Sequence, residues 1–240
     1  MIFLGTNLLK NNECSKLKGT IIEADEGEVF DIELEKDLLQ KNEQIAIQNK
    51  KTLDENKIKA IDIMGSIGSG KTSLIECLAD KLKGKYKIAV LNGDLTTTID
   101  SDRIEKHGVN VIQINTGKEC HLDANLVKKA IDQLELSNLD LIFIENVGNL
   151  ICPAEFPLGS SKRLVVISVT EGPYMVIKHP YIFIEADVAV INKIDMAEAM
   201  QVNIEGLIKD INQINPKTKV VTISCRNKEG IDELVEALDL

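Results

Sequence analysis

An eight-residue stretch, GSIGSGKT at residues 65–72, constrains the fold of this 240-residue chain more than any other. It fits the spacing G-x-x-x-x-G-K-[ST], and it lies between an apolar run, KAIDIM, and a helix-type segment, SLIECLADKLKG. A strand, a glycine-rich turn and a helix in this order direct several backbone N–H groups toward one place, where an anion can bind. The chain is therefore expected to contain an α/β domain built on a phosphate-binding loop.

Short apolar runs, most of them rich in β-branched residues, alternate with helix-type segments from residue 58 onward. The runs are 59–64, 86–92, 109–115, 139–145, 163–169, 187–192 and 219–224, and the longest helical segments are 73–84, 121–136, 199–215 and 231–240. Strands that are apolar throughout are buried on both faces. We expect residues 57–240 to form a P-loop domain with a mostly parallel sheet of about seven strands and helices on both faces.

The first 56 residues differ from the rest and are expected to be an N-terminal extension. An alternating stretch at residues 20–35, interrupted by Gly27, favours a β-hairpin. The charged segment at 37–57 has apolar residues at a loosely helical spacing and is expected to form a helix packed on the main domain. The extension holds one cysteine, Cys14, and no histidine, so no metal motif is expected there.

Composition excludes several classes of partner. The net charge is −10 and the pI is about 4.9, which argues against nucleic acid or an anionic membrane. No basic leader and no apolar run of about 20 residues is present, so a cytoplasmic protein with no membrane segment is expected. Five widely spaced cysteines suggest no disulfide framework, and Cys77, among apolar residues, is expected in the core.

The phosphate-binding loop supplies specific chemistry. Its glycines allow positive φ and let backbone N–H groups approach phosphate oxygens, Lys71 neutralises the β- and γ-phosphates, and the Thr72 hydroxyl is offered to Mg²⁺. The residues expected to contact nucleotide here are Gly65, Ser66, Gly68, Ser69, Gly70, Lys71, Thr72 and Ser73.

Two acidic residues follow apolar runs where a magnesium ligand is needed. Glu145 ends LDLIFIE, and Gly148 comes three residues later, an E-x-x-G form of a switch whose glycine N–H can sense the γ-phosphate. Asp94, in LNGDLTTT, ends the second run. We expect Thr72, Asp94 and Glu145 to hold Mg²⁺, and Lys71, Asp94 and Glu145 to serve catalysis. Asp94 is alternatively a strand-end or capping aspartate.

The tetrapeptide NKID at residues 192–195 indicates which base is bound. The Asp195 carboxylate can accept from N1–H and from the 2-amino group of guanine, whereas adenine would leave it unpaired. Lys193 can stack along the base, and Asn192 can brace the loop. SCRNKEG follows the next apolar run and is expected to cap the base through Ser224 and Cys225. Together these motifs predict a GTPase.

Two further loops hold metal-binding residue types. Cys120 and His121, in NTGKECHLDA, follow the third run, and Cys152, in ENVGNLICPA, lies four residues after Gly148. Both loops are expected at the carboxyl edge of neighbouring strands, where ligands gather. Thiolate and imidazole suit Zn²⁺ and Ni²⁺. Three donors do not complete a closed tetrahedral metal site, and a symmetric dimer would bring six donors together across its two-fold axis. Because Cys152 follows the switch, nucleotide can control the metal.

The motifs taken together resemble the HypB family, the nickel-incorporation GTPases of hydrogenase maturation. The resemblance rests on GSIGSGKT, TGKECHLDA, IENVGNLICPA, SVTEG, KHP and NKID, between residues 65 and 195. It implies a SIMIBI-class GTPase fold, slow GTP hydrolysis and a nucleotide-favoured homodimer that shares a nickel or zinc site made by Cys120, His121 and Cys152. It also implies Ni²⁺ delivery to the large subunit precursor of a [NiFe] hydrogenase, with a HypA-type nickel/zinc protein as partner.

The chain departs from the family pattern in two places. Many relatives have an N-terminal C-x-x-C-G-C motif or a histidine-rich tract, and this chain has neither. After SVTEG, Pro173, Tyr174 and Met175 replace the usual acidic and lysine residues, although Lys178 remains, either as a contact to a second subunit or as a solvated lysine.

Three other functions stay open. One is another SIMIBI metal-insertion GTPase such as a urease nickel chaperone, which carries Cys-Pro-His where this chain has Glu-Cys-His. A P-loop kinase acting on a small molecule is disfavoured by NKID. The third is a metal-storage or regulatory GTP-binding module without useful turnover.

Overall fold

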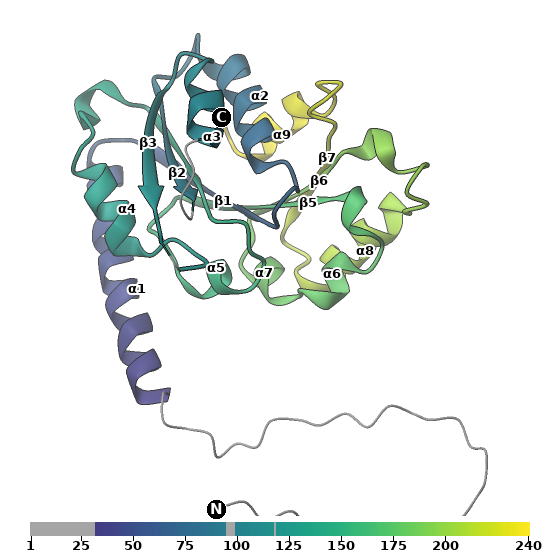
Figure 1. Cartoon of the computed structure of the whole chain (residues 1–240), viewed down its shortest axis with the longest axis horizontal. Helices are drawn as coiled ribbons and strands as arrows, with labels where there is room; N and C mark the ends of the chain where they lie inside the picture. Colours follow the sequence, from purple (N-terminus) through teal and green to yellow (C-terminus); the bar gives the residue numbers. More distant parts are fainter. Residues whose placement is uncertain (1–31, 95–98, 118) are drawn as a thin grey trace, which may run out of the picture.

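Seven strands form one sheet in which every neighbouring pair is parallel (Figure 1). The structure is a computed structural model and describes residues 32–94, 99–117 and 119–240. The strands are β1 (Lys59–Gly65), β2 (Ile88–Asp94), β3 (Asn110–Asn115), β4 (Leu141–Glu145), β5 (Lys162–Ser168), β6 (Val188–Asn192) and β7 (Lys219–Thr222), in the order β3-β2-β4-β1-β5-β6-β7. The predicted α/β fold with a parallel sheet is confirmed.

Helices cover both faces of the sheet (Figure 1). One face carries α2 (Lys71–Leu82), α3 (Ile99–Glu105) and α9 (Ile231–Ala237); the other carries α1 (Ile32–Glu55), α4 (Ala124–Ile131), α5 (Cys152–Glu155), α6 (Met175–Lys178), α7 (Tyr181–Ile184) and α8 (Ile204–Ile214). Three 3₁₀ turns, η1 (Leu136–Asn138), η2 (Val169–Glu171) and η3 (Ile194–Met196), complete the described elements. Within the described ranges, no helix combines the length and apolar character needed to cross a bilayer.

Alternation along β1 divides the core into two sides. Ile61 and Ile63 pack with α2 and α9 on one face, while Ala60 and Met64 contribute to the clusters on the other face. Successive strand residues point to opposite faces, so a strand covered on both sides must be apolar at nearly every position. Asp62 interrupts this pattern and is completely buried.

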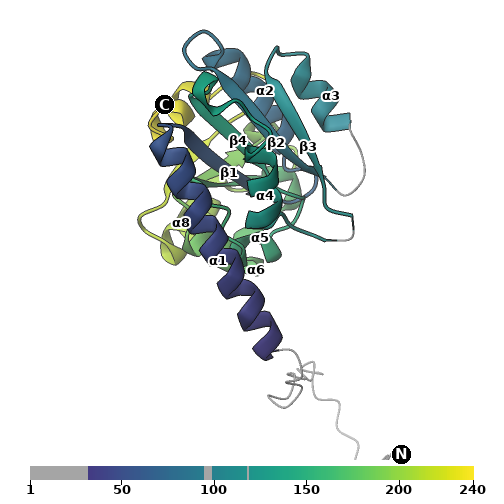
Figure 2. The ribbon, with the colours of Figure 1, turned by 90° about the vertical axis from the view of Figure 1, so that its left-hand side faces the viewer.

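The N-terminal helix α1 runs alongside α4, and its first turns project away from the sheet (Figure 2). Two buried asparagines attach it: Asn42 accepts from the Ala124 N–H at 2.7 Å, and Asn49 donates to the Ala124 carbonyl at 2.8 Å. The expected hairpin at 20–35 lies mostly outside the described residues. Its last four residues, 32–35, begin α1 instead of a strand, because they continue the charged helical segment that follows.

The strand order corrects one expectation about the metal-type loops. The loops after β3 and β4 were expected to follow neighbouring strands, but β2 lies between those strands. The loop after β3 nevertheless crosses the end of β2 and meets the loop after β4, because the β2 residue below this crossing is a glycine, Gly93. A Cβ added to Gly93 would lie 2.8 Å from the Leu122 side chain and 3.0 Å from the Glu145 carbonyl oxygen. The missing side chain therefore lets the two loops close over β2.

Candidate functional site

The phosphate-binding loop connects β1 to α2 and depends on its glycines. Gly65 and Gly70 have φ of 155° and 100°. A Cβ would lie 2.3 Å from the Val166 carbonyl oxygen at Gly65, and 2.3 Å from the Asn192 amide nitrogen at Gly70. Both the conformation and the close approach exclude a side chain. The Lys71 Nζ is buried in the loop and donates to the carbonyls of residues 65 and 66, each at 3.1 Å.

The serines of the loop differ in what they touch. Ser69 is fully buried and its hydroxyl donates to the Ser66 carbonyl at 3.0 Å, so only its backbone remains for a phosphate. The Ser66 hydroxyl hydrogen-bonds to Glu171. Ser73 accepts from Arg103 at 3.2 Å. Gly148 lies directly against the loop, since a Cβ there would be 2.4 Å from the Ile67 side chain. The proposed switch glycine therefore contacts the phosphate-binding loop.

A cavity of about 480 Å³ opens beside this loop. The residues that line it include Gly68, Gly70, Lys71, Thr72, Ser73, Asp94, Asp100, Arg103, Glu145, Gly148 and Lys193. The Thr72 hydroxyl donates to Glu145 Oε1 at 2.7 Å, and Glu145 Oε2 has no hydrogen-bond partner among the described residues. Thr72, Asp94 and Glu145 thus face one cavity, and their oxygen atoms are the ligand type that Mg²⁺ prefers.

Burial raises the pKa of Glu145 to about 7, although Lys71 and the Thr72 hydroxyl act in the opposite direction. The folded chain therefore holds a proton that the unfolded chain, with an ordinary pKa of 4.5, releases. Between pH 4.5 and about 7 the folded state binds more protons than the unfolded state. The contribution of Glu145 to the free energy of unfolding is therefore complete below pH 4.5 and is lost as the pH rises through about 7.

Glu145→Gln should remove this pH dependence because glutamine can accept the Thr72 hydrogen bond without a charge. Without nucleotide or metal, we expect the variant to gain on the order of 3 kcal/mol in the free energy of unfolding at pH 8, a shift of about 2.5 pKa units, and little at pH 5. Urea denaturation at both pH values measures this. Equal effects at the two pH values would contradict it.

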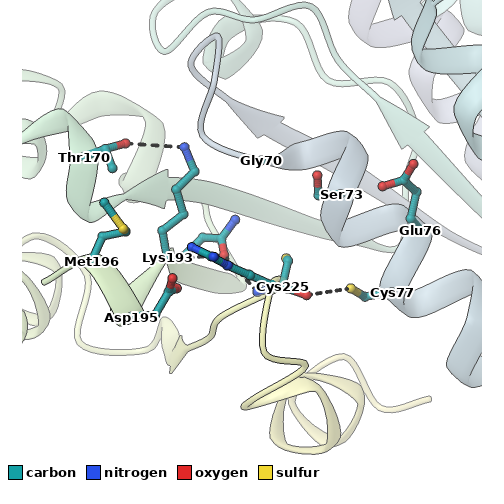
Figure 3. A pocket seen from close by; sticks show the side chains of 11 residues that line it. Gly70, Ser73, Glu76, Cys77, Thr170, Lys193, Asp195, Met196 and Cys225 are labelled. Atoms are coloured by element: carbon teal, nitrogen blue, oxygen red, sulfur yellow. Dashed lines mark hydrogen bonds between the residues drawn. The ribbon is translucent and has the colours of Figure 1, made fainter.

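A second cavity, of about 530 Å³, continues from the first and lies between α2 and the loops after β6 and β7 (Figure 3). Its lining includes Gly70, Ser73, Glu76, Cys77, Thr170, Asn192, Lys193, Asp195, Met196 and Cys225. Asn192 donates to the Ser69 carbonyl at 2.9 Å and accepts from the Cys225 N–H at 3.4 Å, so it joins the phosphate loop to the loop after β7.

The NKID residues shape this second cavity. Lys193 has φ of 60°, and its Nζ donates to the Gly68 carbonyl at 2.6 Å and to Thr170 at 3.4 Å. Its side chain therefore spans one wall of the cavity (Figure 3). Asp195 Oδ1 accepts from the Ser224 hydroxyl at 2.6 Å, which orients the carboxylate. This carboxylate and the lysine stem both line the second cavity.

Cys77 corrects a sequence expectation. It was expected in the core, but it is half-buried and lines the second cavity. Its thiol lies 3.7 Å from the Cys225 carbonyl oxygen (Figure 3), and the interaction with Cys225 is the main cause that lowers the pKa of Cys77 to about 7. The apolar residues around Cys77 in the sequence belong to the buried face of α2, whereas Cys77 lies at that face's edge.

Two charged residues beside the phosphate loop were not assigned to the site from the sequence. Glu171, in SVTEG, accepts from the Ser168 N–H at 2.6 Å and hydrogen-bonds to Ser66. Burial raises its pKa, while Ser168, Lys193 and Lys71 oppose that shift. Arg103 forms ion pairs with Glu76 at 2.8 Å and Asp100 at 3.1 Å. The SVTEG motif was a usable signal for Glu171, but nothing in the sequence paired Arg103 with α2.

Cys120, His121 and Cys152 come together beyond the ends of β3 and β4. Their ligand atoms all lie within 4.8 Å of one another, and the two sulfur atoms are 3.1 Å apart. The His121 ring packs on Phe156 with 3.9 Å between centroids. Asp123 caps α4 by accepting from the Leu126 N–H at 2.7 Å, which fixes where the preceding loop ends. We call Cys120, His121 and Cys152 the metal-type trio.

The protonation states of the trio suit a soft or borderline cation. Burial lowers the pKa of His121, so the imidazole is neutral and can donate a lone pair. The hydrogen bond with the neighbouring Cys120 thiol is the main cause that raises the pKa of Cys152, and burial raises it further. A bound divalent cation would favour both thiolates, and binding would release protons. Two sulfurs and one nitrogen fit Zn²⁺ or Ni²⁺ better than Mg²⁺.

The parallel sheet, the phosphate-binding loop and the two joined cavities define a P-loop nucleotide-binding domain. Residues 59–222 match the family described as "CobW/HypB/UreG, nucleotide-binding domain". A probable hydrogenase maturation factor HypB from Methanocaldococcus jannaschii is 51% identical over 208 residues, which are 87% of this chain and 94% of that protein. The hydrogenase maturation factor HypB of Escherichia coli is 38% identical, over 87% of this chain and 72% of that protein.

Solved structures agree with these matches. The crystal structure of HypB from Archaeoglobus fulgidus is 41% identical with a TM-score of 0.78, and covers 83% of this chain and 98% of that one. HypB from Helicobacter pylori, crystallised in complex with nickel, is 35% identical with the same TM-score, and covers 83% and 95%. The chain belongs to the HypB family within the CobW/HypB/UreG group.

Proposed function

We propose that this chain is a GTP-hydrolysing metallochaperone that inserts Ni²⁺ into a [NiFe] hydrogenase during its maturation. One observation carries the proposal. The eight-residue segment 145–152 begins with Glu145, which is hydrogen-bonded to the phosphate-loop Thr72, and ends with Cys152 of the metal-type trio. We call it the switch segment. A movement of the switch segment in response to the γ-phosphate would therefore be transmitted along this short segment to a metal ligand.

The names of the relatives support the choice of cargo and client. Those from Methanocaldococcus jannaschii and Escherichia coli are hydrogenase maturation factors, and the Helicobacter pylori structure contains nickel. For this chain, Ni²⁺ is the cargo, and Zn²⁺ is a competing occupant of the same donor set. A cytoplasmic setting, a HypA-type nickel/zinc protein and the hydrogenase large subunit precursor complete the proposal.

Nucleotide hydrolysis is assigned to the first cavity. Lys71 and the backbone N–H groups of the loop would hold the phosphates, while Gly148 contacts the same loop and can report the γ-phosphate. Mg²⁺, held by Thr72, Asp94 and Glu145, would supply positive charge against the developing negative charge on the phosphates. Asp94 also faces the cavity where an attacking water would lie. Among the described residues that line the first cavity there is no glutamine, which fits slow turnover.

Guanine specificity is assigned to the second cavity. The Asp195 carboxylate is oriented by Ser224 and accepts from the two adjacent donors of guanine. The Lys193 stem would cover one face of the base, and the loop of Ser224 and Cys225, which the Cys225 N–H joins to Asn192, would cap its edge. An adenine ring would leave the carboxylate without partners, which disfavours ATP.

A homodimer would complete the metal site. The trio supplies three ligands, and a second copy would add three more across a two-fold axis. Ile151, adjacent to Cys152, is 58% exposed, so an apolar side chain is available next to the ligands. A partner surface that covers Ile151 would join the switch segment to the interface, so that nucleotide and metal control dimerisation together.

A nickel titration of the purified protein tests the proposal. We expect Ni²⁺ affinity or the dimer fraction to differ between GDP and a non-hydrolysable GTP analogue, followed by Ni–thiolate absorption and light-scattering mass. Cys152→Ala should weaken Ni²⁺ binding by about 100-fold or more, since losing a ligand should cost at least as much as losing an outer-shell partner. Cys14→Ala, outside the trio, is the matched control. Identical binding in both nucleotide states and in Cys152→Ala would contradict the proposal.

A second client deserves a separate test. The Helicobacter pylori relative is a hydrogenase/urease maturation factor, 35% identical over 85% of this chain and 85% of that protein. A urease nickel chaperone is therefore the alternative for this chain. Affinity capture from cells that express both enzymes distinguishes them, because recovery of a urease subunit without a hydrogenase subunit would replace the client.

A further inference from the structure

Two asparagines of the switch segment hold the loop that carries the other two metal-type ligands. Asn146 Oδ1 accepts from the Leu122 N–H at 3.0 Å, and Asn149 Nδ2 donates to the Cys120 carbonyl at 3.4 Å. These backbone groups lie on either side of His121. The segment that contains Cys152 therefore also grips the backbone around Cys120 and His121, although about 30 residues separate the two in sequence.

The orientation of the Asn146 side-chain amide is fixed by the buried carboxylate of Asp62. Asn146 Nδ2 donates to Asp62 Oδ1 at 3.2 Å, and Asn146 is only 1% exposed. Because the amide nitrogen must face Asp62, the amide oxygen must face the Leu122 and Val147 N–H groups, at 3.0 and 3.1 Å. Because the amide is buried, a flipped amide would leave the Leu122 and Val147 N–H groups unpaired. Asp62 thereby directs the Asn146 amide oxygen toward the Leu122 N–H.

Asp62 and Arg163 connect the same network to the residues that follow Cys152. Arg163 Nε lies 4.0 Å from Asp62 Oδ2, and neither atom has a hydrogen-bond partner among the described residues. Arg163 Nη2 donates to the carbonyls of Pro153 at 2.8 Å and Ala154 at 3.1 Å. One buried ion pair on β1 and β5 therefore supports the loop of Cys120 and His121 through Asn146, and Cys152 through α5.

We propose that Asn146 and Asn149 are positioning residues that clamp the Cys120–His121 loop to the switch segment. The three ligands then move as one body when the switch responds to nucleotide, and Asp62 with Arg163 anchors that body to the sheet. The clamp rests on the proposed function, and it supplies the contacts through which a nucleotide-driven shift of the switch segment would reach all three metal ligands. Without the clamp, a shift of the switch segment would displace Cys152 alone and leave Cys120 and His121 behind.

Asn149 offers the cleaner test because it is half-buried and its loss leaves the core intact. Its side chain has two separate tasks: Nδ2 reaches the Cys120 carbonyl, while Oδ1 accepts from the Ile151 N–H at 2.9 Å within its own turn. Serine can accept from an N–H two residues later but is too short to reach Cys120. Asn149→Ser thus removes the Asn149–Cys120 contact and keeps the turn, and Asn149→Ala removes both; the Asn146–Leu122 contact remains in each variant.

The experiment measures Ni²⁺ affinity by Ni–thiolate absorption in GDP and in a GTP analogue, for wild type, both variants and Asn138→Ala, an exposed asparagine on η1. We expect both Asn149 variants to bind Ni²⁺ about 10-fold more weakly, with the ratio between nucleotide states falling toward one. Because coupling is reciprocal, Ni²⁺ should also stop changing the affinity for the GTP analogue. Thermal unfolding should match wild type, which excludes a merely structural effect.

The outcomes separate the clamp from the function on which it rests. If Asn149→Ser keeps the wild-type ratio, Asn149 is not a positioning residue, so the two-asparagine clamp is wrong and the proposed function still stands. If only Asn149→Ala loses the ratio, the turn at Ile151 carries the coupling, which also overturns the clamp. If wild type itself shows equal affinity in both nucleotide states, the nucleotide-controlled metal site fails and the clamp fails with it.

Discussion

Asp195→Asn is expected to weaken GTP binding by about 10²- to 10³-fold and to make xanthosine triphosphate the preferred nucleotide. The Asp195 carboxylate lines the second cavity and is oriented by the Ser224 hydroxyl at 2.6 Å. An asparagine amide would present an N–H₂ group to the 2-amino group of guanine, so two donors would face each other. Xanthine has a carbonyl oxygen at that place, which restores the pair and defines a reversal of specificity.

Competition between labelled GDP and unlabelled GDP or xanthosine diphosphate measures this reversal. Asp232→Asn, an exposed aspartate in the first turn of α9, is the matched control and should leave both affinities unchanged. If Asp195→Asn loses GDP without gaining the xanthosine nucleotide, then Asp195 supports Ser224 and does not read the base. The gain of a new ligand is the informative result because an unfolded variant cannot produce it.

Local sequence signals predicted the fold well because each acts over a few residues. The glycines and Lys71 of the phosphate loop define a strand, a turn and a helix within a single segment. The β-branched apolar runs are continuous because the central strands are buried on both faces, as β1, β4 and β6 are. Periodicity over residues 37–57 indicated α1, although the helix starts earlier, at Ile32.

Pairings between distant residues could not be read from the sequence. The apolar runs do not predict that β2 lies between β3 and β4, since all the runs have similar composition. The role of Gly93 depends on Leu122 lying above it, and this contact exists only in the folded chain. Asp62 reads as an interruption of a strand, and its partner Asn146 is 84 residues away.

The metal-type trio shows how far motif reasoning extends. Residue chemistry suggested that Cys120, His121 and Cys152 belong together, and the structure does bring their ligand atoms within 4.8 Å. The expected reason, adjacent strands, was wrong, because the loops meet across β2. Polar side chains that the motifs did not single out, Asn146 and Asn149, make the contact that joins them.

Lys71→Ala should reduce GTP hydrolysis by about 10³-fold at saturating nucleotide, because it removes the buried positive charge that faces the phosphates. In the structure, the ammonium is held by the carbonyls of residues 65 and 66 at 3.1 Å, so its place is fixed before nucleotide arrives. The trio makes no contact with this lysine, and Ni²⁺ affinity without nucleotide should stay as in wild type. Single-turnover hydrolysis and a Ni²⁺ titration measure the two effects.

Nickel transfer to a metal-free hydrogenase large subunit decides what hydrolysis is for. Lys209→Ala, an exposed lysine on α8, controls for the loss of a charge elsewhere. If Lys71→Ala binds Ni²⁺ normally but no longer transfers it in a GTP-dependent way, hydrolysis drives release from Cys152 through the switch segment. If transfer continues at the wild-type rate, turnover has no part in delivery. A metal-storage or regulatory module would then describe the chain better, because the trio would act without the nucleotide site.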